Sequence, residues 1–208
     1  MSESVATGDP IVSARPLGAM LEELHALDQA LFDAIADTPT PHLDRWVVAL
    51  SGAADYSRLW TAIAVCLAVS GGPPGRRAAL SGMLAVGAAS AVTNIGLKPW
   101  AGRRRPQPTD GRRIADSRRV RRTVSSSFPS GHTASAFAFA SAAGAALPSA
   151  SVPVHLLATT VGYSRVHTGM HYPSDVAVGA AVGVFCGHVV RRLTRALPSS
   201  SADPGRAP

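Results

Sequence analysis

Apolar stretches separated by polar turns recur through most of this chain, and they restrict it to a small set of helical folds. They cover residues 59–70, 78–97, 133–147, 152–163 and 176–190. A membrane-spanning helix needs about 20 apolar residues. The second stretch supplies them, and the others approach that length only with flanking polar residues. The pattern predicts an all-α transmembrane helical bundle of about five helices, or six if an N-terminal helix inserts; a soluble bundle of alanine-rich helices is the alternative.

The segments outside these stretches are polar or amphipathic. Residues 17–37 place leucines at helical spacing between acidic residues, which predicts an amphipathic helix, and a second short helix is expected at about 43–53. At 208 residues the chain suits one domain. We therefore assign 17–196 to a single membrane domain with disordered tails at 1–16 and 197–208. The first tail lacks a basic and apolar leader, so no cleaved secretory signal is expected.

Positive charge is concentrated in one polar loop. The formal net charge is +7, and Lys98 is the only lysine. Nine arginines fall in the loop: Arg103, Arg104, Arg105, Arg112, Arg113, Arg118, Arg119, Arg121 and Arg122. Such a cluster can bind phosphate, lipid headgroups or nucleic acid, although a solvated loop is the simpler explanation. The preference of basic residues for the cytoplasm places Arg76, Arg77 and the arginines at 191–195 on the cytoplasmic side. The arginine-rich loop is therefore expected on the outer side of the cell membrane.

Three polar motifs lie where the apolar stretches end. The first motif is residues 98–106, the second is 129–132 and the third is 164–175. If the motifs meet, Lys98, Arg105 and Arg165 provide three cations suited to phosphate oxygens. The second motif begins a helix at Ser130 and Gly131, and a helix N-terminus with a glycine lets an anion approach the backbone closely. The three motifs together predict a phosphate-binding site.

Two histidines in these motifs can make and break bonds. His171 precedes Asp175 by four residues, and a carboxylate there could keep one ring nitrogen protonated and leave the other free to attack phosphorus. His132, on a different helix, would then give a proton to the leaving oxygen. Two predicted membrane crossings separate the two histidines, so both return to the same face. No Asp/Glu cluster of the metal-binding type accompanies them, so we expect no metal and no cofactor.

The order and spacing of the motifs resemble the signature of the type 2 phosphatidic acid phosphatase superfamily, which includes membrane lipid phosphatases, soluble acid phosphatases and vanadium haloperoxidases. The matching residues are Lys98, Arg105, Pro106, Pro129, Ser130, Gly131, His132, Ser164, Arg165, His171 and Asp175. The resemblance implies that His132 is the acid, His171 forms a phosphohistidine and Asp175 orients His171. It also implies phosphate contacts from Lys98, Arg105, Ser130, Gly131 and Arg165. The apolar flanks favour the bacterial membrane branch, so residues 17–196 would form a phosphatase domain.

The expected partners are the bilayer and a lipid phosphate or polyprenyl (di)phosphate within it, and no nucleic acid; the oligomeric state stays open. Phosphatidic acid, phosphatidylglycerol phosphate, undecaprenyl diphosphate and a polyprenyl-phosphoryl sugar phosphate are all candidates. A vanadium-dependent haloperoxidase-like enzyme and a non-catalytic protein that binds anionic lipid are the alternatives. His167, at a variable position of the third motif, is expected at the surface or at the rim of the site. Trp100 and Tyr172 are expected in an interfacial aromatic belt.

Overall fold

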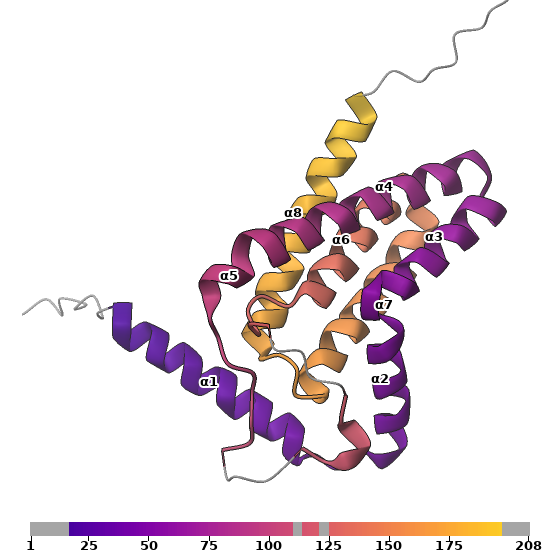
Figure 1. Ribbon diagram of the computed structural model, residues 1–208. Helices are drawn as coiled ribbons and strands as arrows, with labels where there is room; N and C mark the ends of the chain where they lie inside the picture. Colours follow the sequence, from indigo (N-terminus) through magenta and orange to yellow (C-terminus); the bar gives the residue numbers. More distant parts are fainter. Residues whose placement is uncertain (1–16, 110–113, 121–124, 197–208) are drawn as a thin grey trace, which may run out of the picture.

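The computed structural model describes residues 17–109, 114–120 and 125–196, and helices account for most of them (Figure 1). The α-helices are α1 Leu17–Asp37, α2 Pro41–Ala53, α3 Arg58–Ser70, α4 Gly72–Ala91, α5 Lys98–Ala101, α6 Gly131–Ala146, α7 Pro148–His167 and α8 Pro173–Ala196. The short helices are η1 Asp55–Ser57, the π-helix η2 Val92–Leu97, and η3 Asp116–Arg118. The two predicted tails, and Arg112, Arg113, Arg121 and Arg122, lie outside the described residues.

Five helices form the bundle, with α6 packed against α4, α7 and α8, and α3 against α4 (Figure 1). The predicted all-helical bundle is confirmed, and each apolar stretch found in the sequence corresponds to one of α3, α4, α6, α7 and α8. Helices α1 and α2 lie at the end of the bundle where α6 and α8 begin. The turn between α3 and α4 and the end of α8 lie at the opposite end. The arginines at 76–77 and 191–195 therefore gather away from the three motifs.

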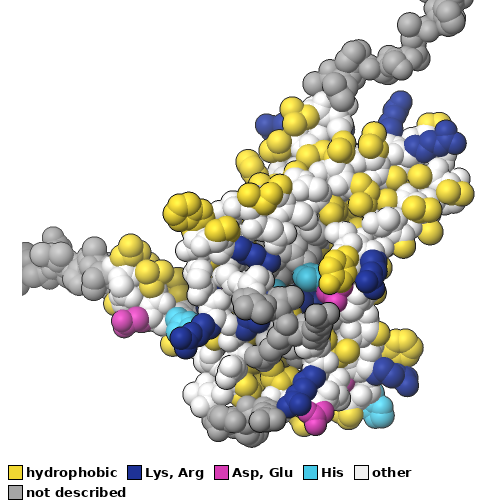
Figure 2. Space-filling model, in the orientation of Figure 1, with side chains coloured by type: hydrophobic (Ala, Val, Ile, Leu, Met, Phe, Trp, Pro, Cys, Tyr) yellow, Lys and Arg dark blue, Asp and Glu magenta, His cyan; other side chains and the backbone are white. Residues whose placement is uncertain are grey.

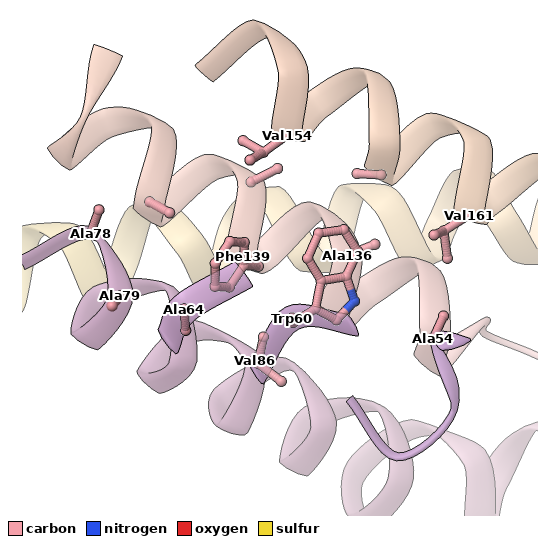
Figure 3. Packing of buried hydrophobic residues seen from close by; sticks show 13 residues of the cluster. Ala54, Trp60, Ala64, Ala78, Ala79, Val86, Ala136, Phe139, Val154 and Val161 are labelled. Atoms are coloured by element: carbon pink, nitrogen blue, oxygen red, sulfur yellow. The ribbon is translucent and has the colours of Figure 1, made fainter. Parts of the chain in front are cut away.

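The core of the bundle is made mostly of alanine. Figure 3 shows the rings of Trp60 from α3 and Phe139 from α6 packed together, with their centroids 5.3 Å apart, among alanine and valine side chains. Most alanines of α6, among them Ala134 and Ala142, are fully buried because helices surround this element on several sides. Small side chains let helix backbones approach closely, which is the packing typical of helices in lipid.

Glycines bring α8 against α6 and thereby bring two of the motifs together. Gly179, Gly183 and Gly187 recur every fourth residue on α8 and face the backbone of α6. A Cβ at Gly179 would lie 2.5 Å from the Ser130 carbonyl oxygen, and one at Gly183 would overlap the backbone of Ala134. Any larger residue would therefore push the helices apart. This contact fixes the start of α8, in the third motif, beside the start of α6, in the second.

Within the described residues, two helical segments are long and apolar enough to cross a membrane, Gly72–Ala101 and Pro173–Arg195. Large apolar side chains such as Val69, Leu80 and Phe185 are exposed on the outside of the bundle, and hydrophobic atoms cover much of its surface in Figure 2. An exposed apolar surface of this extent suits contact with lipid. Trp100 is 89% exposed, as its predicted place in an aromatic belt requires, but Tyr172 is buried, so its predicted place in the belt is wrong.

Candidate active site

The three motifs meet at one end of the bundle because of the way the helices run. Lys98 follows the π-helix η2 at the end of the long Gly72–Ala101 segment, and His132 is the second residue of α6. Arg165 lies in the last turn of α7, and His171 and Asp175 flank the start of α8. Helices α6 and α7 are consecutive and antiparallel, so the chain returns to the end from which it left. Distortions of the π-helical type are frequent at functional sites.

His171 is buried and has a defined tautomer. Its Nδ1 lies 2.6 Å from the backbone carbonyl oxygen of Ser127, which can only accept a hydrogen bond. Nδ1 therefore carries the proton, and Nε2 keeps its lone pair. No hydrogen bond from a described residue reaches Nε2. A lone pair on an oriented, desolvated imidazole is what nucleophilic attack on phosphorus needs.

Asp175 is fully buried, and its contacts differ from those expected. The carboxylate Oδ2 lies 3.7 Å from Nδ1 of His171, beyond hydrogen-bond length, and accepts the backbone N–H of Tyr172 at 2.9 Å. Arg103 donates to Oδ1 at 2.6 Å. Asp175 thus supports His171 through its charge, while the directional hydrogen bond to His171 comes from the carbonyl of Ser127, which the sequence did not reveal.

The environment of His171 has a measurable consequence. Burial lowers the pKa of His171 to about 4, and the positive charges of Arg165 and Arg105 act in the same direction against the opposing charge of Asp175. The ring should therefore stay neutral at every pH above about 4. We expect the ring nitrogens of His171, followed by NMR in ¹⁵N-histidine-labelled protein without phosphate, to titrate near pH 4. A midpoint near the ordinary value of about 6.5 would contradict this environment; the His171→Asn protein assigns the signal.

His132 is paired with an acidic residue from outside the three motifs. Its Nε2 lies 2.8 Å from Oδ1 of Asp55, in the turn η1 between α2 and α3. The same carboxylate oxygen lies 3.8 Å from a terminal nitrogen of Arg165. The hydrogen bond to His132 lowers the pKa of Asp55, although burial opposes this, so the carboxylate stays ionised. An ionised partner favours the protonated form of His132, the form that can donate a proton.

Each of the three predicted cations donates a hydrogen bond to a neutral group. Lys98 Nζ donates to Asn94 Oδ1 at 2.9 Å, and Arg105 donates to the Met170 carbonyl at 2.6 Å. Arg165 is buried, and one of its terminal nitrogens donates to Ser51 Oγ at 2.6 Å. Its Nε is also buried and has no partner among the described residues. A buried guanidinium N–H without a partner is costly unless a ligand accepts it.

Ser130 and Gly131 stand at the start of α6. Ser130 is fully buried; its hydroxyl caps the helix by accepting the Thr133 N–H at 3.4 Å, and its own N–H donates to the Asp175 carbonyl at 3.0 Å. Gly131 faces Lys98, since a Cβ there would lie 3.5 Å from Nζ. The helix N-terminus and the lysine charge therefore act on the same space.

A polar cavity of about 190 Å³ opens beside His132. It is lined by Ala54, Tyr56, Ser57, Ser90, Asn94, Lys98, Gly131, His132 and Ser135. Hydroxyl and amide groups predominate in this lining, and Ser90 and Ser135 lie within hydrogen-bond distance of each other, at 3.2 Å. The cavity gives His132 a free side from which the rest of a phosphate ester could approach.

His167 and Arg118 both lie outside the site. The expectation that His167 is a surface or rim residue is wrong: it is 2% exposed, and its Nε2 bonds Asp44 at 2.9 Å. Arg118 is also buried, and it donates to Asp44 and to the carbonyls of Ile35, Ala36 and Thr38. It thereby caps the end of α1. Arg118 is thus a structural residue of the arginine-rich loop.

Residues 78–198 match the PAP2 superfamily. A lipid A 4'-phosphatase of Bacteroides thetaiotaomicron is 33% identical over 127 residues, which are 57% of this chain and 56% of that protein. A decaprenylphosphoryl-5-phosphoribose phosphatase of Mycobacterium tuberculosis is 46% identical over 68 residues, 31% of this chain and 35% of the relative. A lipid A 1-phosphatase of Porphyromonas gingivalis is 42% identical over 71 residues, 32% of this chain and 16% of the relative. The match thus covers little more than half of the length of the first of these curated relatives and less than half of the other two.

Two solved structures share the fold. A transmembrane PAP2-type phosphatidylglycerolphosphate phosphatase from Bacillus subtilis has a TM-score of 0.65 and 22% identity, over 86% of this chain and 89% of the other. LpxE from Aquifex aeolicus has a TM-score of 0.64 and 26% identity, over 80% of this chain and 95% of the other. The likeness shows the fold, and the long apolar helices with their exposed apolar side chains suit a membrane protein.

Proposed function

The chain belongs to the PAP2 superfamily, and from this premise we propose that it is a metal-independent membrane phosphatase acting on a lipid phosphate or polyprenyl (di)phosphate. One observation carries the proposal. Two histidines with opposite roles lie at one end of the bundle: His171 is neutral, and His132 is paired with a carboxylate. Arg165 lies at the same end, and its buried Nε has no partner among the described residues. A phosphoryl oxygen is the acceptor that this arrangement lacks.

In the proposed mechanism, Nε2 of His171 attacks phosphorus while the bond from phosphorus to the leaving oxygen breaks. His132 gives its proton to that oxygen, so that a neutral hydroxyl departs. A water molecule then attacks the phosphohistidine, His132 takes one of its protons, and the nitrogen–phosphorus bond breaks to release phosphate. Lys98, Arg105 and Arg165 offset the negative charge on the equatorial oxygens in both steps, with the N-terminus of α6.

The substrate class follows from the position of the site. The motifs lie at the ends of apolar helices, so a substrate with an acyl or prenyl anchor would bring its phosphate to this depth. We propose a multi-pass protein with five spans, α3, α4, α6, α7 and α8. The site would face the outside, because the arginines at 76–77 and 191–195 lie at the other end and favour the cytoplasm. The relatives named for lipid A, phosphoribose and phosphatidylglycerol phosphate support a lipid-linked substrate.

The test is release of inorganic phosphate by the purified protein in detergent. The panel contains phosphatidic acid, phosphatidylglycerol phosphate, undecaprenyl diphosphate, lipid A and decaprenylphosphoryl-5-phosphoribose. We expect release from at least one lipid, unchanged by EDTA and inhibited competitively by vanadate, which resembles the five-coordinate transition state. Loss of activity in EDTA would contradict the metal-independent mechanism. Absence of release from the whole panel would contradict the proposed function.

A further inference from the structure

Helix α1 carries an unusual apolar surface for a segment outside the bundle. Six large apolar side chains are each between 46% and 72% exposed: Leu17, Met20, Leu21, Leu24, Leu27 and Leu31. They recur every three or four residues and so form one stripe along the helix, hereafter the leucine stripe. Glu22, Glu23 and Ala26 project from another side. The stripe is thus not used for packing within the described part of the chain.

Next to the leucine stripe, the buried side chains Asp28 and Phe32 attach α1 to the rest of the molecule, and the contacts of Asp28 lead to the site. Asp28, buried within α1, accepts the N–H of Ser174 at 2.8 Å and so caps the start of α8 from outside. Asp28 also accepts a hydrogen bond from Arg103 at 2.6 Å, and Arg103 in turn donates to Asp175 at 2.6 Å. The guanidinium lies 4.2 Å from the centroid of the Tyr172 ring. Helix α1 is therefore fixed to the residues that surround His171.

The depth of the leucine stripe matches that of the membrane interface. Trp46, Tyr56 and Trp100 are 65%, 84% and 89% exposed, and they lie at the site end, in α2, η1 and α5. Exposed aromatic residues at the ends of spanning helices mark the headgroup layer. Helix α1 runs across the bundle direction at this end, and its hydrophobic atoms lie mainly on the side toward which the bundle extends (Figures 1 and 2). The stripe thus continues the lipid-facing surface of the bundle.

We propose that α1 is an interfacial helix that lies in the leaflet on the active-site side, with its leucine stripe in the acyl region. Its acidic side remains in water, as in other in-plane amphipathic helices. Asp28 joins α1 to Arg103, and Arg103 joins it to Asp175 beside His171. Contact between α1 and the bilayer therefore keeps these residues in position around His171. The occupant of the stripe is lipid, since the stripe is continuous with the other lipid-facing surfaces at the same depth.

A depth measurement tests the location without relying on any activity. Leu24→Cys or Ala26→Cys is introduced into protein in which Cys66 and Cys186 are serine, then spin-labelled and reconstituted in phosphatidylglycerol-containing vesicles. We expect the label at position 24 to collide more with oxygen than with a water-soluble nickel complex, and the label at 26 to show the reverse. Greater access of nickel at position 24 would overturn the proposal. So would spin–spin broadening at position 24 that disappears on dilution with unlabelled protein, because it would identify a second copy as the occupant.

The link to the site is tested with the matched substitutions Leu24→Glu and Ala26→Glu. Both add the same charge to an exposed position of one helix, but only the first adds it to the stripe. We expect Leu24→Glu to reduce turnover of a lipid phosphate in vesicles several-fold and Ala26→Glu to leave it unchanged, with equal melting temperatures. Equal turnover in the two variants would contradict the link. If the wild-type protein releases no phosphate at all, the proposed function fails while the depth result still stands.

Discussion

Phosphate release is expected to fall by roughly 10⁴-fold or more when His171 is replaced by asparagine, because the proposed covalent intermediate can no longer form. Asparagine keeps an N–H group that can donate to the Ser127 carbonyl, so the loop retains a partner for the 2.6 Å bond of the wild type. It has no nitrogen lone pair able to attack phosphorus. The loss should therefore appear in kcat, whereas KM should change little because the cations remain.

The measurement is phosphate release in detergent from the best lipid of the panel, with melting temperature as the check on folding. His188→Asn is the matched control, since His188 is exposed on α8 and, among the described residues, hydrogen-bonds the carbonyl one turn earlier. A substrate labelled with ³²P should mark the wild-type protein, but not the His171→Asn protein, with an alkali-stable phosphoryl group. Turnover that survives in His171→Asn would remove His171 as the nucleophile. A protein that merely binds anionic lipid would keep its lipid affinity and show no turnover in either form.

The bundle was predictable because its signal is local. Each apolar stretch in the sequence became a helix, and the break at Pro39 and Pro41 separates α1 from α2 as expected. The three motifs were visible as polar residues at the ends of these stretches, and antiparallel connection explains why they meet. The spacing of Gly179, Gly183 and Gly187 carries information of the same kind, and a search for small residues at every fourth position would have found the contact between α6 and α8.

The groups that tune the two histidines were not predictable in this way. Ser127 acts through its backbone carbonyl, so its side-chain identity carries no signal. Asp55 is 77 residues from His132, and it reaches the ring through a turn in which Tyr56 and Ser57 adopt positive φ angles. The spacing of His171 and Asp175 suggested a direct hydrogen bond, but side chains four residues apart meet on a helix, and α8 begins only at Pro173. The carboxylate oxygen nearest His171, Oδ2, instead accepts the N–H of Tyr172, and Arg103 donates to the other oxygen.

Replacing His132 by glutamine is expected to slow release of an alcohol leaving group by about 10²- to 10⁴-fold, the usual contribution of a positioned proton donor. Glutamine can still donate to Asp55, so the turn η1 should keep its place. A nitrophenyl phosphate ester needs little protonation of its leaving oxygen, and its phosphorylation of His171 should be slowed much less. This difference between substrates distinguishes a proton donor from a residue that only shapes the site.

Asp55→Asn provides the second arm of this prediction. It preserves the shape of the carboxylate and removes the charge that lies 2.8 Å from Nε2 of His132. Without that charge the protonated ring is less stable, so the alkaline side of the pH profile for kcat should move to lower pH. Arg165 also loses the carboxylate oxygen 3.8 Å away, which should favour phosphate binding rather than weaken it. A decrease in kcat with an unchanged or lower KM would therefore identify Asp55 as the residue that keeps His132 protonated. A higher KM with an unchanged pH profile would rule that role out.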